Sequence, residues 1–376
     1  MVNIKRKSIF SFCFLILILA IPLIFLAGCN QSNNLFEFGL KTDGSYSIKE
    51  VKNKDVTSVE IPTTYNGKPV KHIDRSAFEG CEELTSVIIP EGVETIDNYA
   101  FKDCSKLENI SLPDSITEIE SGVFDNCTSL QYNTFENGNY LGNTNNPFVV
   151  LISGIDNSVV SYKVNENCNV IYENALSDFS KLTNIDMPYS ITYIGSNAFS
   201  LCTSLESFTV PNFVKYFDAS WFYYCTNLQS ITLSANIELV SIGYMYGCNS
   251  FSEFNVYSTN SRFTAKDGVL YSKDLKTLLA YPIAKEGNNF EIPSYVEEIA
   301  TYTFNGCKNL KSLTMWGTME TLNSGAVINC ESLHTLYFKG TMDEWIELDN
   351  SNIGWDHSFV VNKVICSNGV LNRDRA

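Results

Sequence analysis

Signatures of catalysis and metal binding are scarce in this sequence of 376 residues. There are only three histidines, and none has a partner at a metal-ligand spacing such as H-E-x-x-H: His72, His334 and His357. There is no C-x-x-C pair, which argues against zinc, and no G-x-S-x-G, P-loop or Rossmann glycine pattern. The sequence therefore predicts no metal, no cofactor and no catalytic residues. A scattered catalytic triad in a glycan- or peptide-processing enzyme stays open as the least favoured alternative.

Basic residues are also in short supply. The chain has 26 Lys and Arg against 42 Asp and Glu, a formal net charge of −16. This balance argues against a nucleic-acid partner and against electrostatic docking on anionic lipid. The acids are spread along the chain, and 44% of the residues are hydrophobic, so we expect an ordered chain with a solvated surface.

The N-terminus lacks an apolar run long enough to span a membrane, because the run ends after Ile9–Phe25. Lys5, Arg6 and Lys7 precede it, which is typical of a secretory signal. The following Leu-Ala-Gly-Cys resembles the lipobox of bacterial lipoproteins, which implies a signal peptide over 1–28 and a lipid on Cys29. An uncleaved anchor helix is the alternative. Removal of the signal takes away three basic residues and no acid, so the formal charge falls to −19.

The rest of the chain is dominated by a repeat. Nine units begin at equivalent apolar residues, mostly 23 apart, at Ile73, Ile96, Ile119, Ile171, Ile194, Phe217, Val240, Ile299 and Leu322. Two intervals are longer, 52 and 59 residues, and each is one repeat plus an insert. A fixed period of this length is typical of a solenoid.

Each unit carries the same apolar positions, which in the second unit are Ile96, Ala100, Phe101, Cys104, Leu107, Ile110, Leu112 and Ile116. The spacing L-x-x-I-x-L at 107–112 matches the strand of a leucine-rich repeat, and Pro113 ends that strand. The preceding NYAFKDC segment suits a helical turn. One unit buries too little apolar surface to offset the entropy of ordering its backbone, so the units must stack.

The full pattern I-x-x-x-A-F-x-x-C-x-x-L-x-x-I-x-L-P-x-x-(I/V) resembles the BspA-like leucine-rich repeat, also called the Treponema pallidum type. IPTTYNGKPV at 61–70, NGNYLGNTNNPFVVL at 137–151 and FTAKDGVLYSKDLKTLLAYP at 263–282 resemble that family's opening segment and insertions. FKGTMDEWIEL at 338–348 and VICSNGV at 364–370 resemble its closing segment, so the resemblance covers residues 40–376. It implies a mostly β/irregular, right-handed solenoid of nine 23-residue coils, with short parallel strands on the concave side and two β-hairpin-type insertions.

This interpretation divides the chain into a signal peptide (1–28), a tether (29–39), the solenoid (40–340) and a C-terminal cap (341–376). The inserts lie at about 133–160 and 257–298. In the second insert, turns at Lys266-Asp267-Gly268 and Lys273-Asp274 flank predicted strands at Val269–Tyr271 and Thr277–Tyr281. The inserts either widen a coil or present a binding tip.

Eight of the twelve cysteines share one repeat position: Cys81, Cys104, Cys127, Cys202, Cys225, Cys248, Cys307 and Cys330. The unit that starts at Ile171 has Phe179 there, and phenylalanine can replace a buried apolar side chain but not a metal ligand or a nucleophile. Side chains at equivalent positions of stacked strands point the same way, about 4.8 Å apart, which does not suit a disulfide. We expect a ladder of buried thiols, with disulfides or a metal as alternatives. Cys168 is predicted to lie in the core, and Cys366 has no predicted place.

The outward-facing strand positions are small and polar. One row contains Ile88, Ser111, Asp186, Thr209, Thr232, Asn255, Thr314 and Tyr337, and a parallel row contains Ser86, Asn109, Asn184, Ser207, Ser230, Glu253, Ser312 and Thr335. They form either an ordinary solvated sheet or a face for a partner. We take Asp186, Thr209, Thr232 and Asn255 as candidate binding residues.

The unit WFYYC at 221–225 departs from the repeat, with Trp221 in place of alanine. Its Tyr223 and Tyr224, with Tyr244 and Tyr246 one coil later, form a candidate recognition patch, because aromatic residues dominate interface energetics. The alternative is that they pack under an insert.

Together these features favour a lipid-anchored cell-surface protein that binds an extracellular protein or glycan, as the resemblance to adhesion-associated proteins implies. Its membrane contact would be the lipid on Cys29. A structural envelope lipoprotein without a specific ligand is the main alternative, since a fold does not determine a function.

Overall fold

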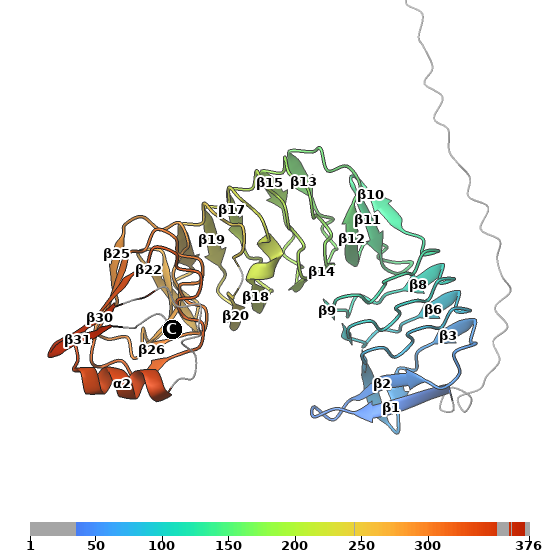
Figure 1. Ribbon diagram of the computed structural model, residues 1–376. Helices are drawn as coiled ribbons and strands as arrows, with labels where there is room; N and C mark the ends of the chain where they lie inside the picture. The colour runs from blue at the N-terminus through green and yellow to red at the C-terminus, as the bar shows by residue number, and fades with distance from the viewer. Residues whose placement is uncertain (1–34, 244, 352–360, 362, 373–376) are drawn as a thin grey trace, which may run out of the picture.

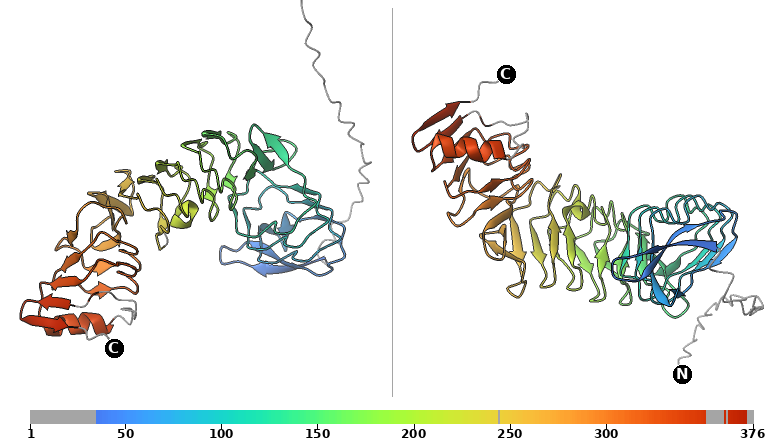
Figure 2. Two further views of the ribbon diagram at one scale, coloured as in Figure 1. Left: turned by 45° about the horizontal axis from the view of Figure 1, so that its top comes forward. Right: turned by 90° about the horizontal axis from the view of Figure 1, so that it is seen from below.

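The computed structural model describes residues 35–243, 245–351, 361 and 363–372. Stacked coils follow one another along an arch, with the N-terminal coils at one foot and the C-terminal coils at the other (Figure 1). Two further directions of view show the same row of coils (Figure 2). The predicted leucine-rich-repeat solenoid is confirmed, although it has about 13 turns and not nine.

The nine predicted unit starts all lie in one series of short parallel strands. This start series consists of β5 (Lys68–Ile73), β7 (Thr95–Ile96), β9 (Glu118–Ile119), β14 (Val170–Ile171), β16 (Tyr193–Ile194), β18 (Tyr216–Asp218), β20 (Leu239–Ser241), β26 (Glu298–Ile299) and β28 (Thr321–Leu322). Ile73 lies beside Ile96, which lies beside Ile119, so the sequence alignment predicts the strand register correctly.

The L-x-x-I-x-L segments form a second parallel series. This repeat series consists of β3 (Ser58–Glu60), β6 (Ser86–Ile88), β8 (Asn109–Ser111), β13 (Ser161–Lys163), β15 (Asn184–Asp186), β17 (Ser207–Thr209), β19 (Ser230–Leu233), β21 (Glu253–Val256), β25 (Asn289–Glu291), β27 (Ser312–Met315) and β29 (Thr335–Phe338). In Figure 1, β13, β15, β17 and β19 lie along the outer rim of the arch, and β14, β18 and β20 face its opening. The expectation that these strands line the concave side is wrong. In a leucine-rich repeat with wide helices, the helices take the outer rim and the strands take the inner one. Here the segment between the two strands of a unit is a compact turn, so no wide helix places the repeat series on the inner rim.

Three of the additional turns come from segments outside the aligned units. The opening segment contains β1 (Phe36–Leu40), β2 (Tyr46–Val51) and β4 (Thr64–Tyr65), the first insert contains β10 (Asn133–Phe135), β11 (Gly138–Leu141) and β12 (Val150–Gly154), and the second contains β22 (Phe263–Lys266), β23 (Val269–Ser272) and β24 (Thr277–Ala280). Ile48 pairs with Ile73, Leu151 with Ile171 and Leu278 with Ile299. Each of these segments therefore completes a coil of its own, which the repeat alignment did not detect.

Both inserts contain the antiparallel hairpins that the sequence predicts. β10 pairs with β11. In the second insert the two predicted strands are β23 and β24, which pair with each other, and β22 also pairs with β23. The turn at Asp267-Gly268 has positive φ at both residues, as a two-residue hairpin turn requires. In each insert the third strand pairs antiparallel with the second, β12 with β11 and β24 with β23, and its other edge joins the parallel start series.

The predicted core is confirmed in the second unit, where all eight apolar side chains are at most 7% exposed. The predicted helical turn is instead a chain of tight turns, because Tyr99 and Asp103 have positive φ and interrupt a right-handed helix. Only η1 (Ala219–Phe222) is a short 3₁₀ helix among the described turns. Backbone bonds such as Phe101 N–H to the Val123 carbonyl, 3.1 Å, join the turns of neighbouring coils.

The C-terminal end is closed by α2 (Met342–Ser351), β30 (Lys363–Cys366) and β31 (Gly369–Asn372). Thr341 and Glu344 form a capping box at the start of α2: the Glu344 carboxylate accepts from the Thr341 N–H at 2.6 Å. Trp345 packs edge-on against Phe338 of the last repeat strand, with ring centroids 5.3 Å apart. This cap covers the last coil.

Candidate binding surface

The outward-facing rows of the repeat series are aligned within four separate sheets, and they are interrupted at both inserts and at the step between β15 and β17. Thr209 of β17 lies beside Thr232 of β19, which lies beside Asn255 of β21. Asp186 lies beside Lys163 of β13. It does not pair with Thr209, because β15 and β17 belong to different sheets.

An open groove of about 570 Å³ occupies this step between β15 and β17, and we call it the wedge. Its lining includes Asp186 and Thr209 but neither Thr232 nor Asn255. Ile185, at the middle of β15, is half-buried, whereas the corresponding Ile231 of β19 is fully buried. Sequence reasoning missed the wedge, since the 23-residue spacing continues across it without a change.

The wedge combines aromatic, apolar and polar side chains. Tyr189 is 84% exposed at its edge, and Met187, Pro188, Phe208, Pro211 and Tyr257 also line it. Asn184, Ser207, Asn212 and Ser234 supply neutral polar groups, and Asp186 is its one charged lining residue. Ligand pockets commonly have this composition, apolar with a few polar groups.

The tyrosine cluster is brought together as predicted. The Tyr223 and Tyr246 rings stack with centroids 5.4 Å apart, and the Tyr224 ring lies edge-on to both, 5.2 Å from each. Tyr224 is 41% exposed and Tyr246 is 55% exposed, so an insert does not cover them. Tyr244 lies outside the described residues.

The backbone of Tyr224 adds a second departure from the repeat. Its φ of +59° is left-handed, as at the equivalent residues of other coils. Most of these are glycine, asparagine or aspartate, such as Gly80, Asn126 and Gly247, but Leu201 of the preceding coil is also bulky, with a φ of +61°. A bulky side chain in this conformation is strained, and such strain concentrates at functional sites.

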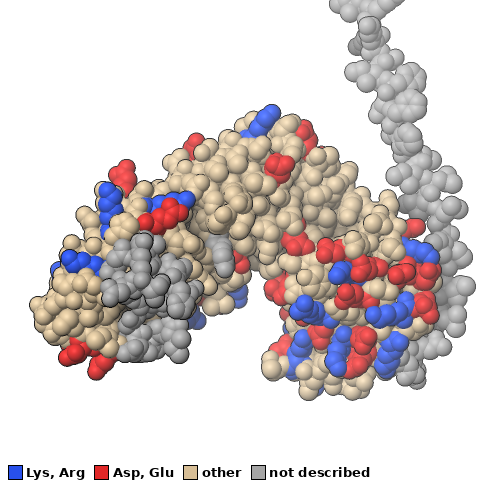
Figure 3. Space-filling view, in the orientation of Figure 1, with Lys and Arg blue, Asp and Glu red and all other residues tan. Residues whose placement is uncertain are grey.

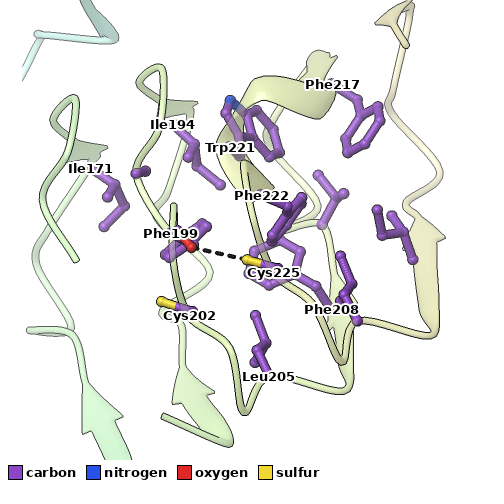
Figure 4. Close-up of a cluster of buried hydrophobic side chains, with 14 of the residues drawn as sticks. Ile171, Ile194, Phe199, Cys202, Leu205, Phe208, Phe217, Trp221, Phe222 and Cys225 are labelled. Atoms are coloured by element: carbon purple, nitrogen blue, oxygen red, sulfur yellow. Dashed lines mark hydrogen bonds between the residues drawn. The ribbon is translucent and has the colours of Figure 1, made fainter. Parts of the chain in front are cut away.

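The buried neighbours of the cluster explain why the rest of WFYYC packs normally. Trp221 is 1% exposed and meets Phe217 edge-on at 5.3 Å, while Phe222 stacks on Phe199 at 5.7 Å. Figure 4 shows these rings filling the space between coils. The tryptophan therefore fills the core, and only the tyrosines reach the surface.

The eight ladder cysteines are buried and unpaired. Their role differs from simple apolar filling, since the thiol of Cys225 lies 3.1 Å from the Phe199 carbonyl of the preceding coil (Figure 4). The same contact recurs at Cys104, Cys127, Cys202, Cys248, Cys307 and Cys330, always 26 residues back. Burial raises the pKa of Cys202 and Cys248 to about 12. These thiols are structural donors with little thiolate character.

The remaining cysteines are placed as follows. Cys168 is fully buried, as predicted, and its thiol contacts the Val170 carbonyl at 3.2 Å. Cys366 ends β30 and is 7% exposed in the C-terminal core cluster. Cys29 lies outside the described residues.

The described part of the chain has neither a cluster of metal ligands nor a membrane-spanning helix. It holds no group of three or more His, Cys, Asp or Glu side chains that could bind a metal ion. Over the same residues, no helix has the length and apolar character needed to cross a bilayer.

Charge is distributed unevenly over the arch. Figure 3 shows basic and acidic side chains alternating on the N-terminal lobe and few of either on the middle of the arch. On the lobe, ion pairs join successive coils, for example Lys71 to Glu94 at 2.7 Å and Lys106 to Glu83 at 2.6 Å. The middle of the arch therefore carries fewer charged side chains on this face than the N-terminal lobe does.

The chain is similar to a known repeat family and to several solved structures. The model of the BspA type leucine-rich repeat region matches the chain in 6 copies, over residues 47–145, 156–267 and 284–347. No curated protein matches the chain. A solved leucine-rich repeat protein of T. pallidum is 27% identical, with a TM-score of 0.32, and the alignment covers 58% of this chain and 88% of that chain.

Two other solved structures cover more of the chain. A leucine-rich repeat protein of Eubacterium ventriosum is 19% identical, with a TM-score of 0.39, over 82% of this chain and 71% of that chain. A leucine-rich cell surface protein of Faecalibacterium prausnitzii is 18% identical, with a TM-score of 0.33, over 84% of this chain and 96% of that chain. The family model matches the part of the chain that the two strand series occupy.

Proposed function

Because the chain belongs to the BspA-type leucine-rich repeat family, we propose that it is a lipid-anchored cell-surface protein that binds a macromolecular partner, a protein or a glycan. The secretory signal and the lipobox-like sequence ending at Cys29 support export and anchoring. A stacked solenoid offers an extended surface to a partner. No catalytic group is part of the proposal.

The tyrosine cluster is the observation that carries the binding role. A chain that buries Trp221, Phe222 and Phe217 leaves Tyr224 and Tyr246 exposed, in mutual contact, and holds Tyr224 in a strained backbone conformation. Tyrosines are enriched among the residues that dominate binding energy, because they combine a large apolar ring with a hydroxyl group. The tyrosine cluster, with its exposed rings in mutual contact, has the composition of a binding hot spot.

A binding screen of residues 30–376 against matrix proteins and glycans tests the proposal. Tyr223→Ser with Tyr246→Ser should remove about 2 kcal/mol or more of binding free energy to a captured partner. The same variant should change the free energy of unfolding by less than about 0.5 kcal/mol, because these side chains lie at the surface.

The matched control replaces exposed tyrosines elsewhere, Tyr132→Ser with Tyr295→Ser, whose residues are 41% and 42% exposed. This control should keep full binding. A large loss of stability with binding intact would show that the cluster serves the fold. Failure of every probe to bind saturably would favour an envelope scaffold without a specific ligand.

A further inference from the structure

The wedge leaves backbone hydrogen-bonding groups without the partners that they have at other steps. In intact steps, Gln229 N–H donates to the Glu206 carbonyl and Thr183 N–H to the Val160 carbonyl, both at 2.8 Å. At the wedge, the equivalent bond from Glu206 N–H to the Thr183 carbonyl is missing from the backbone bonds of the described residues.

The other end of the strands shows the same loss. Val210 N–H donates to the Thr232 carbonyl at 2.9 Å, one coil further on. The equivalent bond from Met187 N–H to the Thr209 carbonyl is missing from the same set of described backbone bonds. Two strand edges with free donors and acceptors therefore face one groove.

The two coils stay joined on the opposite side, so the wedge is a local opening in a continuous stack. Leu176 N–H donates to the Ala198 carbonyl and Asp178 N–H to the Ser200 carbonyl, both at 2.8 Å. The turns are packed at normal spacing, and only the strand side is open.

We propose that the wedge binds an extended peptide segment of a partner protein by strand addition to β15 and β17. Carbonyl groups of the peptide would accept from the Met187 and Glu206 N–H groups, and its N–H groups would donate to the Thr183 and Thr209 carbonyls. An exposed strand edge is a template for this kind of pairing. The inference rests on the proposed binding function and identifies a partner class and a site for it.

The side chains of the wedge specify the peptide further. Tyr189, Pro188 and Pro211 provide surface for an apolar or aromatic side chain of the peptide. Asp186 is the one charged lining residue and the whole chain is acidic, so the peptide is neutral or basic. A glycan would contact the side chains of the wedge but would not form a strand ladder with the two unpaired strand edges. The structure therefore favours a peptide.

The test uses random linear peptides, displayed on phage and selected on immobilised residues 30–376, followed by affinity measurements on one synthetic winner. Met187 packs against the core cluster, so Met187→Ala is the control for the lost side chain. Met187→Pro also removes the free N–H group, at a residue that already precedes a proline and follows an extended residue. It should weaken peptide binding about tenfold, the effect of one hydrogen bond. Met187→Leu keeps the N–H group and should bind like the wild type.

A second pair of variants tests the lining. Tyr189→Ser should weaken the binding of the selected peptide about tenfold. Leu239→Ser changes a residue of β20 that is 65% exposed and distant from the wedge lining, and it should have no effect. Amide hydrogen exchange supplies the direct readout, since the Met187 and Glu206 amides should become protected when the peptide is bound.

The inference is overturned if no peptide is selected, if the winner binds Met187→Pro as well as the wild type, or if the two amides stay unprotected. The inference is also overturned if no peptide is selected but a glycan binds the wild type and fails to bind Tyr189→Ser. A captured macromolecule that still binds both wedge variants would refute the wedge site alone. Peptide binding without any captured macromolecule would instead refute the proposed function.

Discussion

At the scale of the residue, the ladder cysteine serves two needs of a stacked coil. Its small apolar side chain fits the core, and its thiol donates to a carbonyl of the preceding coil that faces the interior, as Cys202 does to Leu176 at 3.3 Å. The repeat pattern predicts the burial, but it cannot show the donor role, because the acceptor belongs to the backbone of another coil.

The raised thiol pKa values predict alkaline destabilisation. Burial moves the pKa of Cys202 from 9.0 to about 12, so the unfolded chain loses this proton at lower pH than the folded chain. The contribution of the protonated Cys202 thiol to the free energy of unfolding is complete below pH 9.0. It is lost as the pH rises toward 12, at ~1.4 kcal/mol per pH unit. Cys202→Ser should reduce the fall of the unfolding free energy with pH by this amount within that window. Equal slopes for the two chains above pH 9.0 would contradict the prediction, and equal slopes below it serve as the control.

Phe179 shows why one coil dispenses with the cysteine. Its ring lies against Gly154 of β12, where an added Cβ would come within 2.1 Å of the ring, and it meets Tyr162 edge-on at 5.7 Å. The phenylalanine thus fills space beside the first insert. The sequence identifies the substitution as apolar, whereas its partner glycine follows only from the structure.

This pairing predicts a compensated double variant. Gly154→Ala alone should destabilise the chain by about 1–3 kcal/mol through overpacking. The double variant Gly154→Ala with Phe179→Cys should lose less stability than the sum of the losses of the two single variants. The shorter cysteine side chain leaves room for the added methyl group. Additive losses in urea unfolding would show that the two residues act independently.

At the scale of the element, the strands were predictable and the turns were not. Alternation at Ile110 and Leu112 and the proline that follows determine a strand on one face of the coil. The A-F-x-x-C turn looks helical by spacing, but left-handed residues such as Tyr99 and Asp103 break it twice. The wedge leaves no trace in the spacing, because it results from how two coils tilt. The contact between Tyr223, Tyr224 and Tyr246 was predictable, since these residues hold exposed positions of two consecutive coils.

The left-handed tyrosine constrains the next coil. At Gly247, one unit after Tyr224, an added Cβ would come within 2.8 Å of the Tyr224 Cα atom. At Gly80, in the equivalent position of another coil, the same atom would meet nothing within 4 Å. Both glycines have positive φ, so replacement by alanine carries the same backbone cost of about 1–2 kcal/mol.

Gly247→Ala should therefore destabilise the chain more than Gly80→Ala, by about 1 kcal/mol or more from overpacking. Denaturant unfolding of the two variants measures the difference directly, with Gly80→Ala as the internal control. If the two variants lose the same stability, the clash with Tyr224 has no energetic consequence.

At the scale of the whole molecule, the coil count depends on segments that lack the motif. The apolar residues Ile48, Leu151 and Leu278 hold the start position of a coil without the surrounding consensus, so alignment alone undercounts the turns. The buried side chains form three clusters along the arch, over residues 36–172, 140–280 and 269–366. Contacts between distant coils are lacking in such a stack, so stability is a sum over neighbours.

This arrangement predicts that damage to the cap stays local. Trp345 is 4% exposed against Phe338, and Trp345→Ala should cost about 3–5 kcal/mol. Hydrogen exchange should then accelerate in β30 of the cap and in β29 and β27, which follow it in the same sheet, while β6 and β8 keep their protection. Ile346→Ala, the next residue of α2 and 44% exposed, is the matched control and should leave exchange unchanged. A uniform rise in exchange from β6 to β30 would instead show that the arch unfolds as one cooperative unit, and the neighbour-by-neighbour description of its stability would fail.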